Sequence, residues 1–255
     1  MVNRDTLIRQ WEAEERFPFQ GWDFSHLDGR WENWEYATLP WDYRAIVKFY
    51  LKDTDRLLDM GTGGGEVLLS IGHPHGNTYA TEAYLPNLEL CRKVLSPLGI
   101  TIAQSYEDDK LPFEREYFDC VINRHESFDL TEVNRVLKPG GYFITQQVGN
   151  QNEREFEQRL NEGSPPLFQE HTIENYVNAL KGMGWRILRT DELLYPIKFF
   201  DVGALVYYAK VVPWEFPDFS VKTHLDKLFA CQQEIEEKGF LSGTGHRWII
   251  AAQKP

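Results

Sequence analysis

The sequence predicts an α/β protein with a doubly wound, mostly parallel sheet of seven strands, an N-terminal helical cap and a helical insertion before the last strand. Short apolar runs alternate with segments of helical periodicity from residue 55 onward, which is the pattern of successive βα units. The first apolar run leads directly into glycines. The stretch 195–245 separates the last two runs and is too long for a hairpin turn, so it predicts an inserted helical lobe.

Residues 1–50 form the predicted cap, in which aromatic side chains are frequent. Asp5 precedes the segment LIRQWEAEE and is the expected cap of a first helix. Pro40 stands at the start of WDYRAIVKFYL, where its fixed φ suits the first turn of a second helix. Between the two helices, prolines and glycines indicate a loop.

Strands and helices alternate through the rest of the chain. The predicted strands are 56–60, 78–82, 100–104, 118–123, 142–148, 185–194 and 247–252. The predicted helices are 64–70, 85–95, 130–137, 152–160 and 172–183, with two more inside the lobe. Because helices join parallel strands into one sheet, we expect residues 51–194 and 246–255 to form a single domain beside the cap and the lobe.

The composition excludes several classes of protein. With 255 residues and 42% hydrophobic side chains, the chain can bury one sizeable core, but no apolar stretch is long enough to cross a membrane. The charged N-terminus lacks the apolar region of a secretory signal, and three scattered cysteines predict neither disulfides nor a zinc site, so we expect a cytoplasmic protein. The net charge of −12 repels phosphate backbones and disfavours a nucleic-acid partner.

The most informative motif is LLDMGTGGGE at 57–66, a buried strand that runs through glycines into a helix. Gly61 and Gly63 allow a tight turn and leave bare backbone for a ligand at the carboxyl end of the strand. Glu82, at the end of the second strand, can accept hydrogen bonds from both hydroxyls of a ribose. The absence of Gly-Lys-Ser/Thr excludes a P-loop, and Glu66 in place of a third glycine disfavours a dinucleotide site. A turn that serves packing alone is the alternative.

The segment from Asp59 to Gly65 resembles the first motif of the class I S-adenosylmethionine-dependent methyltransferases, of the methyltransferase type 11 kind. Glu82 matches the ribose-binding acid of that family. The stretches LPFEREYFD at 111–119 and EVNRVLKPGG at 132–141 are similar to the segments before and after its fourth strand. The resemblance covers residues 50–150 closely and implies a Rossmann-like methyltransferase fold with S-adenosylmethionine as cofactor.

The resemblance also implies roles for the matching residues. The residues implied to bind the cofactor are Asp59, Gly61, Thr62, Gly63, Glu82, Ala83, Tyr106, Glu107, Asp108, Asn123 and Arg124. Asp59 would bind the amino group, directly or through water, and Ala83 would lie beside the adenine. The family often has an aspartate where Glu107 stands, so one of its two neighbours could share the contact with the adenine amino group. Asn123 and Arg124 would contribute backbone contacts near the methionine portion of the cofactor.

The chain leaves the fourth predicted strand through Asn-Arg-His-Glu, where we expect the catalytic groups. Methyl transfer from a sulfonium is a direct displacement, so the protein mainly supplies alignment and, where needed, a base. An ordinary pKa near 6.5 suits His125 to accept a proton, and Glu126 could orient it or act alone. A histidine that only makes a loop hydrogen bond is the alternative. The absence of Asn-Pro-Pro-Tyr disfavours the branch that methylates planar amines.

Further side chains are candidates for the acceptor site or for a metal. Gln146 and Gln147 end the fifth predicted strand, and although alternation does not decide between them, we assign Gln146 to the acceptor site. His73 and His75 have the spacing of a metal pair, but a solvated turn is the expected role, so we predict no metal site. The aromatic candidates for the acceptor site, each with core packing as the alternative, are Trp22, Trp41, Tyr43, Phe200 and Tyr207.

We therefore expect an enzyme that methylates an oxygen or nitrogen atom of a small molecule, because an enclosing lobe and many aromatic side chains favour a compact, partly apolar acceptor. Methylation of ribosomal or transfer RNA is the second hypothesis, disfavoured because the sequence shows neither a basic patch nor a separate RNA-binding module. The third hypothesis is a protein that binds S-adenosylmethionine without turnover. The sequence makes no prediction of the oligomeric state.

Overall fold

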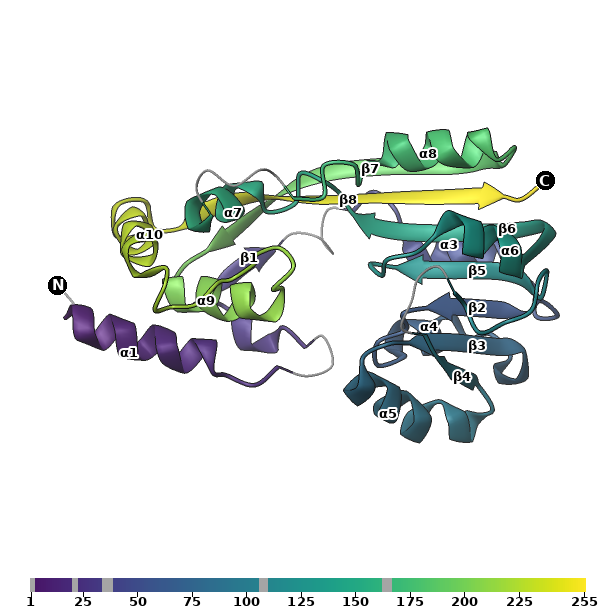
Figure 1. Ribbon diagram of the computed structural model, residues 1–255, viewed down its shortest axis with the longest axis horizontal. Helices are drawn as coiled ribbons and strands as arrows, with labels where there is room; N and C mark the ends of the chain where they lie inside the picture. Colours follow the sequence, from purple (N-terminus) through teal and green to yellow (C-terminus); the bar gives the residue numbers. More distant parts are fainter. Residues whose placement is uncertain (1–2, 20–22, 34–38, 106–109, 162–166) are drawn as a thin grey trace. The chain divides into compact units, whose positions relative to one another are not determined.

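A sheet of eight strands forms the framework, with the strand order β1-β7-β8-β6-β5-β2-β3-β4 (Figure 1). Its members are β1 Trp31–Asn33, β2 Leu57–Met60, β3 Thr78–Glu82, β4 Thr101–Gln104, β5 Phe118–Arg124, β6 Leu137–Val148, β7 Arg186–Phe199 and β8 Leu241–Gln253. The strands from β2 to β6 pair in parallel, whereas β8 is antiparallel to β6 and β1 is antiparallel to β7. The predicted α/β fold with a mostly parallel sheet is confirmed.

The computed structural model describes residues 3–19, 23–33, 39–105, 110–161 and 167–255. The chain divides into two units. The first, which we call the sheet unit, comprises residues 40–149, 170–193 and 247–255. The second, the helical unit, comprises residues 1–39, 150–169 and 194–246. The helical unit thus gathers segments that the sequence interpretation divided among the cap, the central domain and the lobe.

The strands differ from the prediction at one end of the sheet. The sequence predicts seven strands, but a short eighth strand, β1, pairs with residues 197–199 at the end of β7. β7 continues past Leu194 because the alternation of partly buried and exposed residues persists to Phe199. β8 likewise begins at Leu241, before the predicted start at Arg247. Both ends of the stretch predicted as a helical insertion are therefore strand.

Helices flank the strands of the sheet unit. They are α3 Tyr43–Tyr50, α4 Glu66–Ile71, α5 Leu85–Val94, α6 Leu130–Val136 and α8 Ile173–Gly182. α3 does not begin at Pro40 as predicted, because the carboxylate of Asp42 accepts hydrogen bonds from the backbone N–H groups of Arg44 and Ala45 and so caps the helix.

The core of the sheet unit explains why its strands are apolar runs. All four residues of β2 are buried, as expected of a central strand covered on both faces. Strand residues such as Val121 and Phe143 pack in one cluster with Val133 of α6 and Leu180 of α8. Each of these four side chains is fully buried, so the cluster removes a large apolar area from water and stabilises the sheet.

The helical unit is built around one buried helix. Its helices are α1 Arg4–Glu15, α7 Arg154–Leu160, α9 Val202–Val211 and α10 Leu225–Lys238. Eight consecutive residues of α9, 202–209, are buried, and α1 packs along this helix. Trp11 of α1 lies against Phe229 of α10, with ring centroids 5.0 Å apart. Asn3 caps α1 in place of the predicted Asp5, because its side chain accepts a hydrogen bond from the Asp5 N–H.

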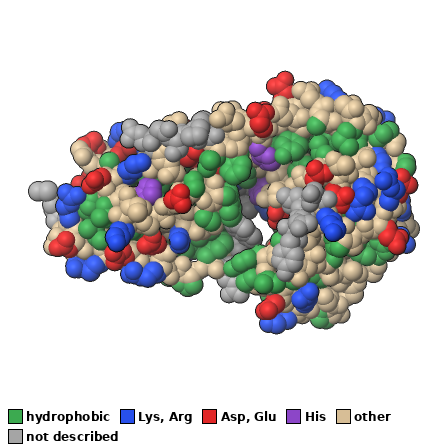
Figure 2. All heavy atoms as spheres, viewed as in Figure 1, with side chains coloured by type: hydrophobic (Ala, Val, Ile, Leu, Met, Phe, Trp, Pro, Cys, Tyr) green, Lys and Arg blue, Asp and Glu red, His purple; other side chains and the backbone are tan. Residues whose placement is uncertain are grey.

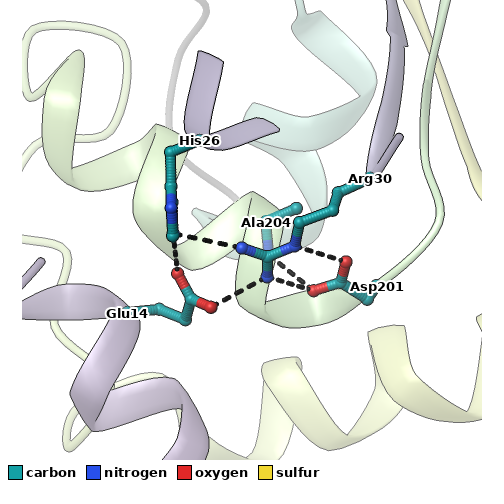
Figure 3. Close-up of polar contacts among 5 residues, drawn as sticks. All are labelled: Glu14, His26, Arg30, Asp201 and Ala204. Atoms are coloured by element: carbon teal, nitrogen blue, oxygen red, sulfur yellow. Dashed lines mark hydrogen bonds and ion pairs between the residues drawn. The ribbon is translucent and has the colours of Figure 1, made fainter. Parts of the chain in front are cut away.

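An ion-pair network joins the N-terminal segments to α9 (Figure 3). Arg30 donates hydrogen bonds of 3.0 and 2.6 Å to the two carboxylate oxygens of Asp201 and lies 2.9 Å from Glu14. Asp201 also caps α9 by accepting the N–H of Ala204 at 2.8 Å. A Cβ at Gly203 would lie 2.9 Å from the Arg30 guanidinium, so glycine at this position makes room for the network.

Candidate active site

The chain turns sharply between β2 and α4. Gly61 and Gly63 have φ values of +66° and +62°, in the left-handed region that favours glycine. The loop is held against β3, since the Gly61 N–H donates to Thr81 Oγ1 at 3.3 Å and the Thr62 N–H donates to the Thr81 carbonyl at 3.0 Å. The bare backbone of the loop is therefore fixed at the carboxyl ends of β2 and β3.

The Glu82 carboxylate is buried at the tip of β3 and is oriented by two backbone groups. The Gly63 N–H donates to Oε2 at 2.9 Å, and the Tyr84 N–H donates to Oε1 at 2.8 Å. Each carboxylate oxygen can accept more than one hydrogen bond, so this geometry leaves capacity for a ligand with hydroxyl groups. Ala83, which follows directly, is exposed.

Asp59 adds a second buried carboxyl group beneath the loop. Its side chain is only 6% exposed, and burial raises its pKa to about 7, while the nearby Arg124 acts in the opposite direction. The negative charge of Glu82 raises the pKa further. A cationic ligand group would stabilise the ionised form, so Asp59 suits an ammonium group better than a neutral partner.

The register of the parallel strands brings further predicted residues to the same edge. Met60, which precedes the glycine loop, lies opposite Asn123 of β5. Arg124 lies opposite Gln146 of β6. Ligands of open α/β sheets bind beyond the carboxyl ends of the strands, and this edge carries the polar residues that the sequence analysis selected.

A chain of hydrogen bonds joins Trp41, just before α3, to the residue that follows β5. Trp41 Nε1 donates to Gln146 Oε1 at 2.8 Å, and Gln146 Nε2 lies 3.1 Å from His125 Nε2. The backbone N–H of His125 donates to the Gln146 carbonyl at 2.9 Å. Trp41 and Gln146 are buried, whereas His125, with a φ of +65°, is exposed. The imidazole is thus anchored by the amide of a buried glutamine.

The surroundings of His125 disfavour its protonated form. Desolvation by nearby protein atoms, followed by the guanidinium charges of Arg124 and Arg247, holds the pKa of His125 well below its ordinary value. Because the side chain is exposed, water limits the effect of desolvation, and the two positive charges are the firmer cause. His125 is therefore neutral at pH 7.

Gln147 serves the interior of the sheet unit. Its Nε2 atom lies 2.5 Å from Asn123 Oδ1, 2.9 Å from Thr145 Oγ1 and 3.0 Å from the Glu126 carbonyl oxygen. Asn123 Nδ2 is buried and has no hydrogen-bond partner among the described residues. The Tyr43 hydroxyl donates to the Asn123 carbonyl at 3.3 Å, and burial, reinforced by Asp59, raises the pKa of Tyr43 well above its usual value. Tyr43 is therefore protonated, buried and bound to the end of β5.

The Glu126 side chain lies directly against Gly61. A Cβ at Gly61 would stand 2.4 Å from Cγ and 2.5 Å from Oε2 of Glu126. The N–H and hydroxyl groups of Ser127 lie 3.2 and 3.3 Å from Oε1 and donate to it. A negatively charged group thus occupies the bare backbone of the loop, where a cationic ligand group would meet it.

The remaining predicted residues have other surroundings. Trp22, Tyr106, Glu107 and Asp108 lie outside the described residues. Phe200 and Tyr207 belong to the helical unit, where Phe200 is partly buried. Tyr207 is buried there between rings, with centroids 5.8 Å from Phe17 and 4.6 Å from His26. Tyr207 therefore packs in the core of its own unit.

The two histidines considered for a metal contact backbone instead. His73 Nε2 lies 2.9 Å from the Asp55 carbonyl oxygen, and His75 Nδ1 lies 3.2 Å from that of Leu98. In the part of the chain that the structure describes, no group of three or more His, Cys, Asp or Glu side chains could hold a metal ion. None of the helices described there combines the length and the apolar character needed to span a membrane.

Sequence reasoning missed two residues that hold the glycine loop from outside the motif. Thr81 binds the loop through both its hydroxyl and its carbonyl group, and its place directly before Glu82 is the signal that points to it. Cys91 of α5 donates from Sγ to the Gly63 carbonyl at 3.0 Å. No sequence pattern distinguishes Cys91 from an ordinary buried cysteine.

A glycine loop after one parallel strand and a buried carboxylate at the tip of its neighbour are typical of α/β proteins that bind nucleotides. Residues 58–145 match the family model described as a methyltransferase domain. This segment of the chain is therefore similar to methyltransferase domains, in agreement with the resemblance that the sequence motifs carry.

Three known proteins are similar to parts of this chain in sequence or in fold. The chain is 32% identical over 171 residues to the phthiotriol/phenolphthiotriol dimycocerosates methyltransferase of Mycobacterium tuberculosis, covering 59% of this chain and 61% of that protein. It is 34% identical over 100 residues to the fatty-acid O-methyltransferase of Mycolicibacterium smegmatis, covering 31% and 36%. The match thus spans less than two thirds of either relative. The geranyl diphosphate methyltransferase structure in complex with SAM shares the fold, with a TM-score of 0.50, 15% identity and coverage of 83% and 84%.

The residues of this edge fit S-adenosylmethionine. Glu82 retains hydrogen-bonding capacity for ribose hydroxyls, and the backbone of Gly61 and Gly63 carries no side chain that would exclude a ligand. Asp59 and Glu126 are the carboxyl groups that would face the ammonium and sulfonium charges of the bound cofactor. Because Glu126 lies on Gly61, its side chain must move aside or contact any ligand that rests on that residue.

Proposed function

We propose that this protein transfers a methyl group from S-adenosylmethionine to an oxygen or nitrogen atom of a small-molecule acceptor. The observation that carries this proposal is the buried Glu82 carboxylate, oriented by the N–H groups of Gly63 and Tyr84 at the tip of β3. A carboxylate in this place recognises a ribose. The match to a methyltransferase domain supports S-adenosylmethionine as the molecule that carries this ribose.

The proposed binding roles follow the geometry of the edge. Glu82 accepts hydrogen bonds from the ribose, with exposed Ala83 beside the adenine. Asp59 binds the amino group, and the loop at Gly61 and Gly63 accommodates the methionine and ribose against bare backbone. When bound, the cofactor supplies an activated methyl group, so the protein has to align the acceptor and exclude water.

Of the two residues proposed for proton transfer, Glu126 is the one that lies on the glycine loop. Its carboxylate contacts Gly61, so a proton released by a hydroxyl or amine acceptor in this region could pass to it. His125 lies one residue before it and is neutral, which suits a hydrogen bond to the acceptor. The enzyme would therefore rely on alignment first and on a carboxylate base second.

A small molecule with an apolar portion is the proposed acceptor. The relatives named above are described as acting on phthiotriol dimycocerosates and on fatty acids, which are apolar small molecules or lipids. On the face shown in Figure 2, basic side chains of the described residues are interspersed with acidic ones, which gives no support to a phosphate-backbone partner. The net charge of −12 acts in the same direction.

Calorimetric titration with S-adenosylmethionine and S-adenosylhomocysteine tests the binding step. We expect binding by the unaltered protein and binding about 10- to 100-fold weaker by Glu82→Gln, because a hydrogen bond to a charged group is worth about 1.5–3 kcal/mol. Glu89→Gln is the matched control, since Glu89 is exposed on α5. Circular dichroism of both variants separates loss of the ligand contacts from loss of the fold. Absence of binding by the unaltered protein would refute the proposal.

Turnover is tested separately by incubating the protein with labelled S-adenosylmethionine and candidate acceptors. We expect S-adenosylhomocysteine to form only with an acceptor present, and the label to enter fatty acids or hydroxylated lipids and not total RNA. Label in RNA would refute the small-molecule acceptor and favour the second hypothesis, methylation of ribosomal or transfer RNA. Cofactor binding without product in any mixture would favour the hypothesis of a protein that binds without turnover.

A further inference from the structure

The hydrogen bonds of Trp41, Gln146 and His125 determine where the histidine proton lies. The nitrogen of an indole can only donate, so the atom of Gln146 at 2.8 Å from Trp41 Nε1 must be the amide oxygen. The amide nitrogen of Gln146 then faces His125 Nε2 at 3.1 Å and can only donate to it. His125 Nε2 is therefore the acceptor in this pair, and in the neutral ring the proton must be on Nδ1.

We propose that Trp41 and Gln146 are positioning residues that hold His125 as the neutral Nδ1–H tautomer, so that His125 acts as a hydrogen-bond donor and not as the base. The tautomer follows from geometry alone, and only the role in the reaction rests on the proposed function. The nitrogen that could accept a proton is occupied by the Gln146 amide. The opposite nitrogen carries the hydrogen and is a donor, so it cannot accept a proton either.

Three further observations support a fixed ring. Gln146 binds His125 twice, through its side chain and through its backbone carbonyl, which accepts the His125 N–H at 2.9 Å. Trp41 and Gln146 are only 7% and 2% exposed, so a flipped amide would leave a buried indole N–H facing another N–H group. Two guanidinium charges near the ring, those of Arg124 and Arg247, oppose a second proton.

The inference limits which acceptors this site can methylate. Transfer to a hydroxyl breaks the carbon–sulfur bond, whose electron pair stays on sulfur, forms a carbon–oxygen bond and releases the hydroxyl proton. If His125 cannot take that proton, it must pass to Glu126 or to water. An acceptor that is already anionic, such as a carboxylate, releases no proton and needs no base.

Long-range ¹H–¹⁵N correlation NMR of the histidine rings tests the tautomer without cofactor or acceptor. The chain has seven histidines, and the spectrum of His125→Gln identifies the signals of His125. In the unaltered protein at neutral pH we expect the downfield resonance of a bare ring nitrogen at Nε2 and the upfield resonance of a protonated nitrogen at Nδ1. The opposite assignment, or an averaged signal from both tautomers, would overturn the proposal.

Two variants test the positioning residues. Gln146→Glu has no N–H to donate, so its carboxylate should draw the proton to Nε2 and invert the two resonances. Trp41→Phe removes the donor that fixes the amide, so the signals should move toward the average of both tautomers. Trp248→Phe is the matched control, because the Trp248 indole is also buried but has no hydrogen-bond partner among the described residues. Unchanged ring signals in Gln146→Glu would overturn the proposal, whatever the outcome of the cofactor titration.

Discussion

Asp59→Asn is expected to change how the stability of the protein depends on pH. The Asp59 carboxyl is buried in β2, and burial raises its pKa from 3.8 to about 7. Between the unfolded-state pKa of 3.8 and the folded-state pKa of about 7, the folded chain binds more protons than the unfolded chain. The contribution of the protonated Asp59 carboxyl to the free energy of unfolding is therefore complete below pH 3.8 and is lost as pH rises through the folded-state pKa. A difference of about 3 pKa units corresponds to about 4 kcal/mol of unfolding free energy.

The asparagine variant cannot lose a proton and therefore does not undergo this loss. We expect its free energy of unfolding, relative to that of the unaltered protein, to rise by about 4 kcal/mol from about pH 4 to about pH 8. Urea unfolding followed by tryptophan fluorescence measures both proteins across this window. Asp53→Asn, which removes an exposed carboxylate before β2, controls for the change in net charge. A stability difference that stays constant over the whole window would refute the burial argument.

Three further substitutions have definite expected outcomes. Gly61→Ala places a Cβ 2.4 Å from the Glu126 side chain at a positive φ, so calorimetry should show cofactor affinity reduced by at least about tenfold, and unchanged affinity would contradict the close approach. Arg30→Lys loses the two-pronged contact with its carboxylate partners, which should lower stability in a thermal melt by about 1–2 kcal/mol, whereas Arg9→Lys on the surface of α1 should not. Tyr208→Phe removes the hydroxyl that binds buried Glu153, and urea unfolding should show a loss of about 1–3 kcal/mol; no loss would mean that water replaces the hydroxyl.

The parallel part of the fold could be predicted because its strands are short, apolar and bounded by glycine or polar residues. β2 and β5 are almost fully buried, so their sequences are continuous apolar runs that periodicity detects. β1 could not be found in this way, because it has three residues and obtains its pairing from β7, which is remote in sequence. The sequence predicts that this strand ends at Leu194, but β7 continues through Pro196 to Phe199, although a proline offers no N–H group to a neighbouring strand.

The candidate site also combines contacts that the sequence predicts with contacts that it does not predict. Gly61, Gly63 and Glu82 could be found because a family motif fixes their spacing within one βαβ unit. The bond between Trp41 and Gln146 joins residues 105 positions apart, and no local pattern encodes it. The contact of Glu126 with Gly61 likewise depends on the alignment of β5 with β2. Interactions within a motif can therefore be predicted from the sequence, whereas interactions between motifs require the sheet register.

The order in which the segments leave the ribosome has a consequence for folding. The helical unit needs residues 194–246 to complete a structure that includes residues 1–39, and β8 enters the sheet between β6 and β7 although it is made after both of them. At synthesis rates of about 5–20 residues per second, the first helix waits roughly ten seconds or more for its partner α9. Neither unit can close before residues 241–253 have been made, so the nascent chain exposes the aromatic side chains of residues 1–50 to chaperones until then.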